Sequence, residues 1–127
     1  MIQVTNFSKS YNDFVAVDGL SFNVAPGDIL GLVGPNGAGK TTTLRVLSGI
    51  IPPGSGTLAV DGHDIVDDAM AAKQVLGYIP DDPRLFDSLT VWEHLEFIAA
   101  AYGVHDSAPQ AEALLQFFNL EDRRHHV

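Results

Sequence analysis

The segment GLVGPNGAGKTTTL, residues 31–44, constrains more strongly than any other what this chain can fold into. Within it, residues 34–41 match the pattern GxxxxGK[ST], in which a glycine-rich loop cradles phosphate groups. Glycines let the backbone curl so that successive amide hydrogens point inward, and they let a phosphate approach the main chain closely. A helix that begins at Lys40 would add its unpaired amides and the positive end of its dipole. The segment therefore predicts a phosphate-binding loop that leads into a helix.

The stretches on either side of the loop supply the structural context that this pattern requires. ILGLV, residues 29–33, predicts a short strand buried on both faces. KTTTLRVLSGII, residues 40–51, has apolar residues at helical spacing, and PPGSG at 52–56 ends that helix. Because a loop-bearing strand is central in a doubly wound sheet, we expect the strand at 29–33 to need neighbours on both sides. An edge that finds no neighbour is a site of aggregation.

The remaining elements of the first 80 residues follow from alternation and turn signals. IQVTNF at 2–7 and FVAVDGLSFNV at 14–24 alternate apolar and polar residues, which predicts two half-buried antiparallel strands joined by a turn at residues 11–13. TLAVDGHDI at 57–65 predicts a strand, an Asp-Gly turn and a second short strand. Next come a short helix in DDAMAAKQV, residues 67–75, and a buried strand in LGYIP, residues 76–80.

Two helices are predicted in the last third of the chain. Thr90 and Glu93 form a capping-box pattern before VWEHLEFIAAAYG, which predicts a helix over about 91–102 that closes at Gly103. APQAEALLQFFNL, residues 108–120, predicts a further helix. We expect one side of it to carry Leu114, Leu115, Phe118 and the terminal Leu120.

Charge and composition exclude several classes of function. The net charge is −9, and the acidic excess lies entirely after residue 60, so the chain has no basic stripe and we expect no nucleic-acid partner. The absence of cysteine excludes a thiolate metal site and favours a reducing compartment, the cytoplasm. The longest apolar runs fall short of the roughly 18 residues that span a bilayer, and the N-terminus lacks a signal-peptide pattern.

Two long stretches resemble the ATP-binding subunits of ABC transporters. VTNFSKSYNDFVAVDGLSFNVAPGDILGLVGPNGAGKTTTLRVLSGIIPPGSGTLAVDGHDI is similar to the start of such a subunit, and LGYIPDDPRLFDSLTVWEHLEFIAAAYGV to the segment that enters its helical subdomain. The resemblance implies an α/β fold, that of the P-loop NTPases of ABC type. It comprises an antiparallel β-subdomain, an incomplete parallel core sheet and the start of the helical subdomain. Residues 1–127 would form one incomplete nucleotide-binding domain, with residues 1–83 in the nucleotide-binding core and 84–127 in the helical part.

The resemblance also assigns site residues. Tyr11 stands where the family has an aromatic residue that stacks on adenine. The phosphate and magnesium loop carries over as Gly34, Pro35, Asn36, Gly37, Ala38, Gly39, Lys40, Thr41 and Thr42. Within it, Lys40 is expected to reach the β and γ phosphates of ATP, and the Thr41 hydroxyl is expected to bind Mg²⁺.

This chain departs from the family's pattern after GYIP. The family has a glutamine there that contacts Mg²⁺ or its water, whereas this chain has Asp81 followed by Asp82. Asp81 is either a carboxylate replacement that takes up the metal contact or a solvated loop acid. The five histidines share no metal-binding spacing, and we expect surface or packing roles for them: His63, His94, His105, His125 and His126.

The resemblance implies an ATPase subunit that couples Mg-ATP binding and hydrolysis to transport through a separate transmembrane permease. A second ATP-binding subunit would complete a dimer at the cytoplasmic side of the membrane, and the pattern after residue 90 is nearest to exporters of the drug type. The family's signature sequence, Walker B aspartate, catalytic glutamate and switch histidine are expected beyond Val127, so we assign no certain catalytic residue and expect negligible hydrolysis by this chain alone. The alternatives are a soluble ABC ATPase not coupled to transport and a truncated nucleotide-binding module without turnover.

Overall fold

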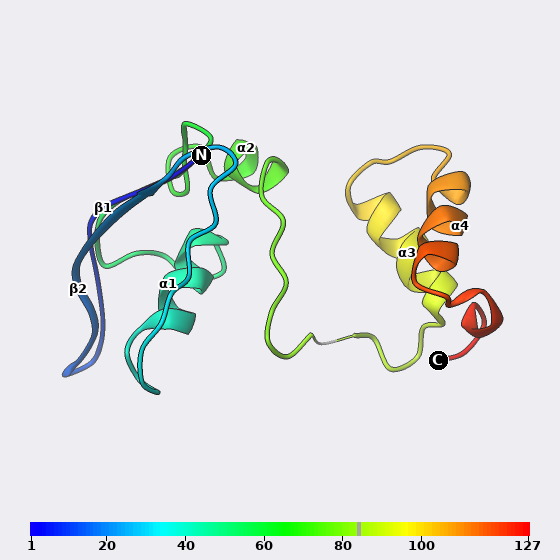
Figure 1. Ribbon diagram of the computed structural model, residues 1–127, viewed down its shortest axis with the longest axis horizontal. Coiled ribbons are helices and arrows are strands. Elements are labelled where there is room, and N and C mark those ends of the chain that lie inside the picture. The colour runs from blue at the N-terminus through cyan, green and yellow to red at the C-terminus, as the bar shows by residue number, and fades with distance from the viewer. Residues whose placement is uncertain (84) are drawn as a thin grey trace. The chain divides into compact units, whose positions relative to one another are not determined.

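The computed structural model describes residues 1–83 and 85–127, which fall into two compact units, Met1–Ile79 and Pro80–Val127 (Figure 1). Residue 84, at which the sequence predicts the second part to begin, lies outside the described residues. None of the helices described in these two ranges has the length and apolar character needed to cross a membrane.

A four-stranded antiparallel sheet forms the body of the first unit. Its strands lie in the order β2 (Phe14–Val24), β1 (Ile2–Tyr11), β3 (Ser55–Val60) and β4 (His63–Asp64). β1 and β2 form the long curved hairpin of Figure 1, and β3 pairs with the other edge of β1. Alternation of apolar and polar residues predicted β1 and β2, and the Asp-Gly turn predicted β3 and β4; all four strands are confirmed.

The core of the first unit lies between one face of this sheet and two helices. Val4, Phe7 and Leu58 are at most 2% exposed on the sheet side. The helical side is built from α1 (Lys40–Leu47) and α2 (Ala69–Gln74), which bury Val46, Leu47 and Ala72 against the same cluster. Each large apolar side chain buried in this way contributes about 1.5–3 kcal/mol. The core therefore fixes α1, and with it the loop that precedes α1.

Turn chemistry sets the register of both hairpins. The β1–β2 hairpin turns through Asn12 and Asp13, and Asn12 adopts a positive φ of 50°. The β3–β4 hairpin turns through Asp61 and Gly62, with φ values of 50° and 85°. Positive φ at both central residues, as in the β3–β4 turn, defines the two-residue turn that matches the twist of paired strands. The predicted Asp-Gly hairpin is confirmed.

Two predicted strands are absent from the described structure. Residues 29–33 and 76–80 belong to no strand, and the side chains of Ile29, Val33 and Ile79 are 100%, 92% and 92% exposed. All strand pairs among the described residues are antiparallel, so the predicted parallel core is not formed there. A strand needs a hydrogen-bonded neighbour, and apolar composition alone does not supply one. The α/β class and the antiparallel β-subdomain are nevertheless confirmed.

The second unit consists of α3 (Val91–Ala101), α4 (Ala108–Phe117) and the short 3₁₀ helix η1 (Glu121–Arg123). The capping box at the start of α3 is confirmed, because the Glu93 amide donates to Thr90 Oγ1 and the Thr90 amide donates to Glu93 Oε2, at 3.3 and 2.7 Å. The chain leaves α3 at Gly103, which has a φ of 66°. The predicted helix at 91–102 is thus found within one residue.

The apolar face predicted for α4 is wrong in part. Ala111 and Leu115 are its buried residues, whereas Leu114 and Phe118 are 46% and 60% exposed. Residues four apart lie on one face of a helix, so the buried stripe runs through Ala111 and Leu115. Apolar residues surround most of this helix, and packing within the unit selects which of them is covered.

Candidate nucleotide-binding site

The phosphate-loop residues form a tight irregular turn that ends in α1. Gly37 and Gly39 have φ values of 85° and 80°, in the left-handed region that side chains with a Cβ rarely adopt. Gly39 occupies the N-cap position, and α1 begins at Lys40, as the sequence predicts. The backbone of this loop therefore requires glycine at positions 37 and 39, and Gly39 is one of the two glycines that the pattern specifies.

Gly39 also lets the loop rest directly on the hairpin. A Cβ atom added to Gly39 would lie 2.4 Å from the carbonyl oxygen of Ala16 and 2.7 Å from Val17 Cγ2, both on β2. No side chain fits in that space. The close approach fixes the end of the loop against the sheet, and the position of the helix N-terminus follows from it.

Lys40 closes the loop from inside. Its ammonium group donates hydrogen bonds to the carbonyl oxygens of Gly34, at 2.7 Å, and Pro35, at 2.8 Å. At the same turn, the buried Thr43 donates its hydroxyl to Gly39 O at 2.9 Å. The ammonium group therefore lies beside the backbone at the start of the loop. Its two partners are neutral carbonyl oxygens, which an anion can replace.

The backbone donors of the loop suit an anionic ligand. Within residues 34–43, all of which the structure describes, the amides of Ala38 and Thr43 donate to Pro35 O and Gly39 O. The first amides of a helix have no partner within it, so those at the start of α1 are available. Together with the Lys40 ammonium they form the donor set that phosphate oxygens require. This donor set fits a phosphate group.

Magnesium would find one hydroxyl ligand in this loop. Thr41 is exposed and lies in the first turn of α1. Among the described residues no group of three or more histidine or acidic side chains could hold a metal ion. Mg²⁺ is commonly held by a few protein ligands with water and substrate phosphates. The Thr41 hydroxyl fits such a shared site.

Tyr11 ends β1 in the same unit, where it pairs with Phe14 across the hairpin. Its side chain is 44% exposed, as a stacking platform needs to be. Sequence reasoning missed Lys9, whose ammonium lies 5.6 Å from the centroid of the Tyr11 ring. The signal was available, because residues two apart on a strand lie on the same face.

Asp81 is exposed in a bend that it shares with Asp82 at the start of the second unit, whereas the loop and Tyr11 belong to the first unit. The structure thus brings the loop and the hairpin together in one unit, and it describes Asp81 in the other.

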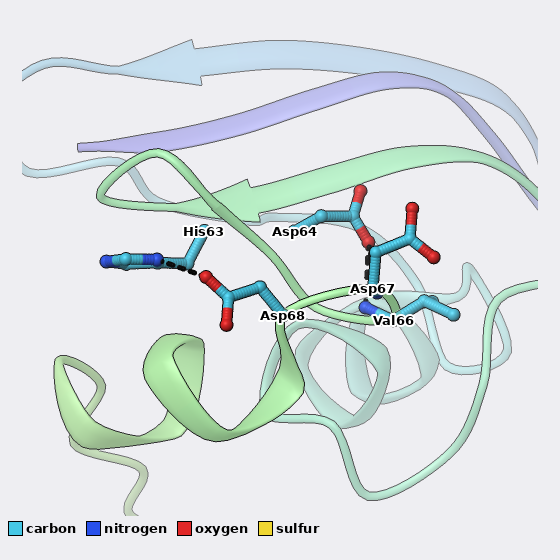
Figure 2. A network of polar contacts seen from close by, with 5 residues as sticks. All are labelled: His63, Asp64, Val66, Asp67 and Asp68. Atoms are coloured by element: carbon cyan, nitrogen blue, oxygen red, sulfur yellow. Dashed lines mark hydrogen bonds and ion pairs between the residues drawn. The ribbon is translucent and has the colours of Figure 1, made fainter.

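Two of the histidines make local contacts. His63 Nδ1 lies 2.6 Å from Asp68 Oδ2. Figure 2 shows this contact and the neighbouring Asp64, whose carboxylate accepts hydrogen bonds from the amides of Val66 and Asp67. His94 Nε2 accepts from the Phe86 amide at 2.9 Å, while its Nδ1 lies 3.0 Å from Thr90 O. Each of these contacts joins neighbouring segments within one unit, as expected of histidines with packing roles.

Comparisons with known proteins agree on one family. Residues 17–127 match the family model described as ABC transporter. The chain is 38% identical over 125 residues to the "Linearmycin resistance ATP-binding protein LnrL" of Bacillus subtilis (strain 168), covering 97% of this chain and 40% of the relative. It is 44% identical over 126 residues to the "Nod factor export ATP-binding protein I" of Paraburkholderia xenovorans (strain LB400), covering 96% and 41%.

A solved structure titled "Structure of ATP binding subunit of ABC transporter" has the same fold. It superposes with a TM-score of 0.86 at 31% identity, over 98% of this chain and 53% of the solved chain. The chain therefore spans about two fifths of the length of these two curated relatives, 40% and 41%, and about half of the solved one.

Proposed function

The chain belongs to the ABC transporter family, and on that premise we propose that it binds Mg-ATP through residues 34–42 with Tyr11 against the adenine. The observation that carries the proposal is the loop itself. Its glycines adopt φ values that favour glycine, its end is pressed on β2, and Lys40 lies over its mouth. A nest of backbone donors with one ammonium group is the chemistry that binds phosphate chains.

Binding of ATP would replace the hydrogen-bond partners of the Lys40 ammonium group. Its ammonium would leave the carbonyl oxygens of Gly34 and Pro35 for phosphate oxygens, which carry full charge and form stronger hydrogen bonds. The amides at the start of α1 would donate to the same phosphates. The Thr41 hydroxyl would hold Mg²⁺, which would supply positive charge to offset the negative charge of the phosphates.

We propose that turnover belongs to the whole ATPase subunit. Phosphoryl transfer needs a group that orients the attacking water, and the resemblance assigns none among these residues. Asp81 is a candidate metal ligand in place of the family's glutamine. Titration of Mg-ATP into Asp81→Asn tests that role, because unchanged affinity leaves Asp81 as a solvated acid.

We propose further that the subunit works with a separate transmembrane permease and a second ATP-binding subunit, at the cytoplasmic face of the membrane. The names of the two relatives, one for resistance and one for export, support an export role. Residues 1–83 would then belong to the nucleotide-binding core and 84–127 to the helical subdomain, an assignment that the helices α3 and α4 support. Co-purification with membranes is expected; co-purification with ribosomes would favour a soluble ABC ATPase.

Calorimetric titration of Mg-ATP tests the binding proposal. Because hydrogen bonds to charged groups contribute about 1.5–3 kcal/mol each, we expect Lys40→Ala to weaken binding roughly 10- to 100-fold. Arg45→Ala is the matched control, since it removes a cation from the last turn of the same helix and leaves the loop intact. Wild-type protein without magnesium-dependent affinity for ATP, or equal affinities of wild type and Lys40→Ala, would overturn the proposal.

A third possibility is a nucleotide-binding module without turnover. A phosphate-release assay separates it from the ATPase, provided that the same assay is run on a whole subunit of this family. Release above background from residues 1–127 alone would contradict our assignment of turnover to the whole subunit.

A further inference from the structure

Lys9 and Tyr11 form a pair at the end of β1. The Lys9 ammonium lies over the Tyr11 ring, 5.6 Å from its centroid. A lysine ammonium within about 6 Å of a ring centroid is attracted by the negative face of the ring. One face of Tyr11 is therefore held by a cation from its own strand.

The same ammonium ties β1 to the segment that follows α1. Lys9 Nζ donates a hydrogen bond to the carbonyl oxygen of Pro52 at 2.7 Å. Next to it the Gly54 amide donates to Ser8 O at 3.0 Å, and a Cβ on Gly54 would lie 2.7 Å from Ser8 O. The chain after α1 thus rests on β1 beside Lys9, with Lys9 as its side-chain anchor.

The segment that carries α1 is fixed to the hairpin at two places. Before the helix, Gly39 is pressed on Ala16 and Val17 of β2, and after it Pro52 accepts from Lys9 on β1. The phosphate loop stands at the start of this segment and Tyr11 stands two residues from its far anchor. Lys9 therefore links the orientation of the Tyr11 ring to the body that holds the phosphate loop.

We propose that Lys9 is a positioning residue for base recognition: it orients the Tyr11 ring so that adenine can stack on the face left open. This inference rests on the proposed function, because it takes Tyr11 as the platform for adenine. The Lys9 ammonium donates to the Pro52 carbonyl oxygen and lies over the Tyr11 ring, so the proposal assigns its role to the ring and not to the phosphates. Its effect should therefore depend on the base.

The test compares ATP with inorganic tripolyphosphate, which has the phosphate chain without the base. Both are titrated with magnesium into the full chain as wild type, Lys9→Met, Lys9→Arg, Tyr11→Ala and the double variant that combines Lys9→Met with Tyr11→Ala. Lys9→Met keeps an apolar stem of similar length and removes the charge and the hydrogen bond, whereas Lys9→Arg keeps both. Thermal unfolding of each variant shows that it is folded.

We expect Lys9→Met to weaken ATP binding about two- to fivefold, the range of an exposed cation–π contact, with tripolyphosphate affinity unchanged. Lys9→Arg should restore ATP binding, and Lys9→Met should add nothing in the Tyr11→Ala background. Equal losses for ATP and tripolyphosphate, or no loss for either, would overturn the role of Lys9. Absence of magnesium-dependent ATP binding in the wild type would instead overturn the proposed function, so the two failures are distinguishable.

Discussion

At the scale of single residues, the site depends on one position where a hydrogen atom replaces a side chain. Gly39 combines a φ of 80° with a backbone oxygen of β2 only 2.4 Å from where a Cβ would lie. The pattern GxxxxGK[ST] requires this glycine for the loop, and the tertiary contact requires it again for the hairpin. Two independent constraints therefore act on one residue.

We expect Gly39→Ala to lower the free energy of unfolding and to abolish tight ATP binding. The left-handed backbone alone costs about 1–2 kcal/mol for a residue with a Cβ, and the clash with Ala16 O adds to that. Chemical denaturation and Mg-ATP titration measure the two effects. Gly31→Ala is the control, because a Cβ there meets nothing within 4 Å. Equal stability of the two variants would show that the contact with β2 is not formed.

At the scale of elements, the N-terminus of α3 is the most completely capped helix end that the described structure contains. Thr90 and Glu93 satisfy each other's amides, and the amides of Val91 and Trp92 donate to the carbonyl oxygens of His126 and Arg124 at 3.0 Å. The C-terminal tail, residues 124–127, thus lies against the start of α3, where the Arg124 guanidinium is 4.4 Å from the Trp92 ring centroid. Arg124 also pairs with Glu112 on α4. The tail thus joins both helices of the second unit.

The capping box makes α3 sensitive to acid. Hydrogen bonds from the Thr90 amide and hydroxyl, with smaller contributions from the nearby His125 and His94, hold the pKa of Glu93 below its ordinary value of 4.5. Because the pKa of Glu93 is lower in the folded state than in the unfolded state, the ionised carboxylate stabilises the folded state fully at pH values above its ordinary pKa. This stabilisation is lost as the pH falls through the lowered one. We expect the difference in unfolding free energy between wild type and Glu93→Gln to shrink on acidification, as denaturation at several pH values would measure.

Thr90 variants provide the control for that experiment. Thr90→Ala removes the acceptor for the Glu93 amide and should cost about 0.5–2 kcal/mol, while Thr90→Ser keeps the oxygen and should cost less. A difference between wild type and Glu93→Gln that stays constant from neutral to acid pH would contradict the assigned role of the carboxylate.

At the scale of the whole molecule, the first unit lacks part of the sheet that its sequence predicts. Residues 29–33 have the composition of a buried strand, yet Ile29 is fully exposed and no described strand pairs with this segment. β1, in contrast, has a hydrogen-bonded neighbour on each side. Protection of backbone amides from hydrogen exchange should therefore differ between segments of the first unit.

We expect backbone amides in residues 29–33 to exchange with solvent rapidly, and amides of β1 to exchange slowly. Exchange requires opening of the hydrogen bond, and local stability follows the density of buried contacts. Mass-spectrometric or NMR hydrogen exchange on the full chain measures both segments at once. Well-protected amides across residues 28–34 would show that this segment finds a strand partner and would contradict the expectation.

The sequence by itself determined the features that depend on neighbouring residues. The antiparallel hairpins follow from alternation and turn residues, α1 begins at Lys40 because the glycine pattern ends there, and Thr90 with Glu93 defined the start of α3. Each is a local rule, in which the interacting groups lie a few positions apart along the chain. The glycine-rich turn that precedes α1 belongs to this class, which is why its end at Lys40 could be predicted without a structure.

Only the tertiary structure decided the features that depend on distant partners. The segments at 29–33 and 76–80 have strand composition but no neighbour to pair with among the described residues. On α4, Leu115 is buried, whereas Phe118 just after the helix is exposed. The contacts of Gly39 with β2 and of Lys9 with Pro52 join residues that are far apart in sequence. The composition of a segment cannot specify which distant group contacts it. Burial and strand pairing each depend on two surfaces, and only one of them belongs to the segment.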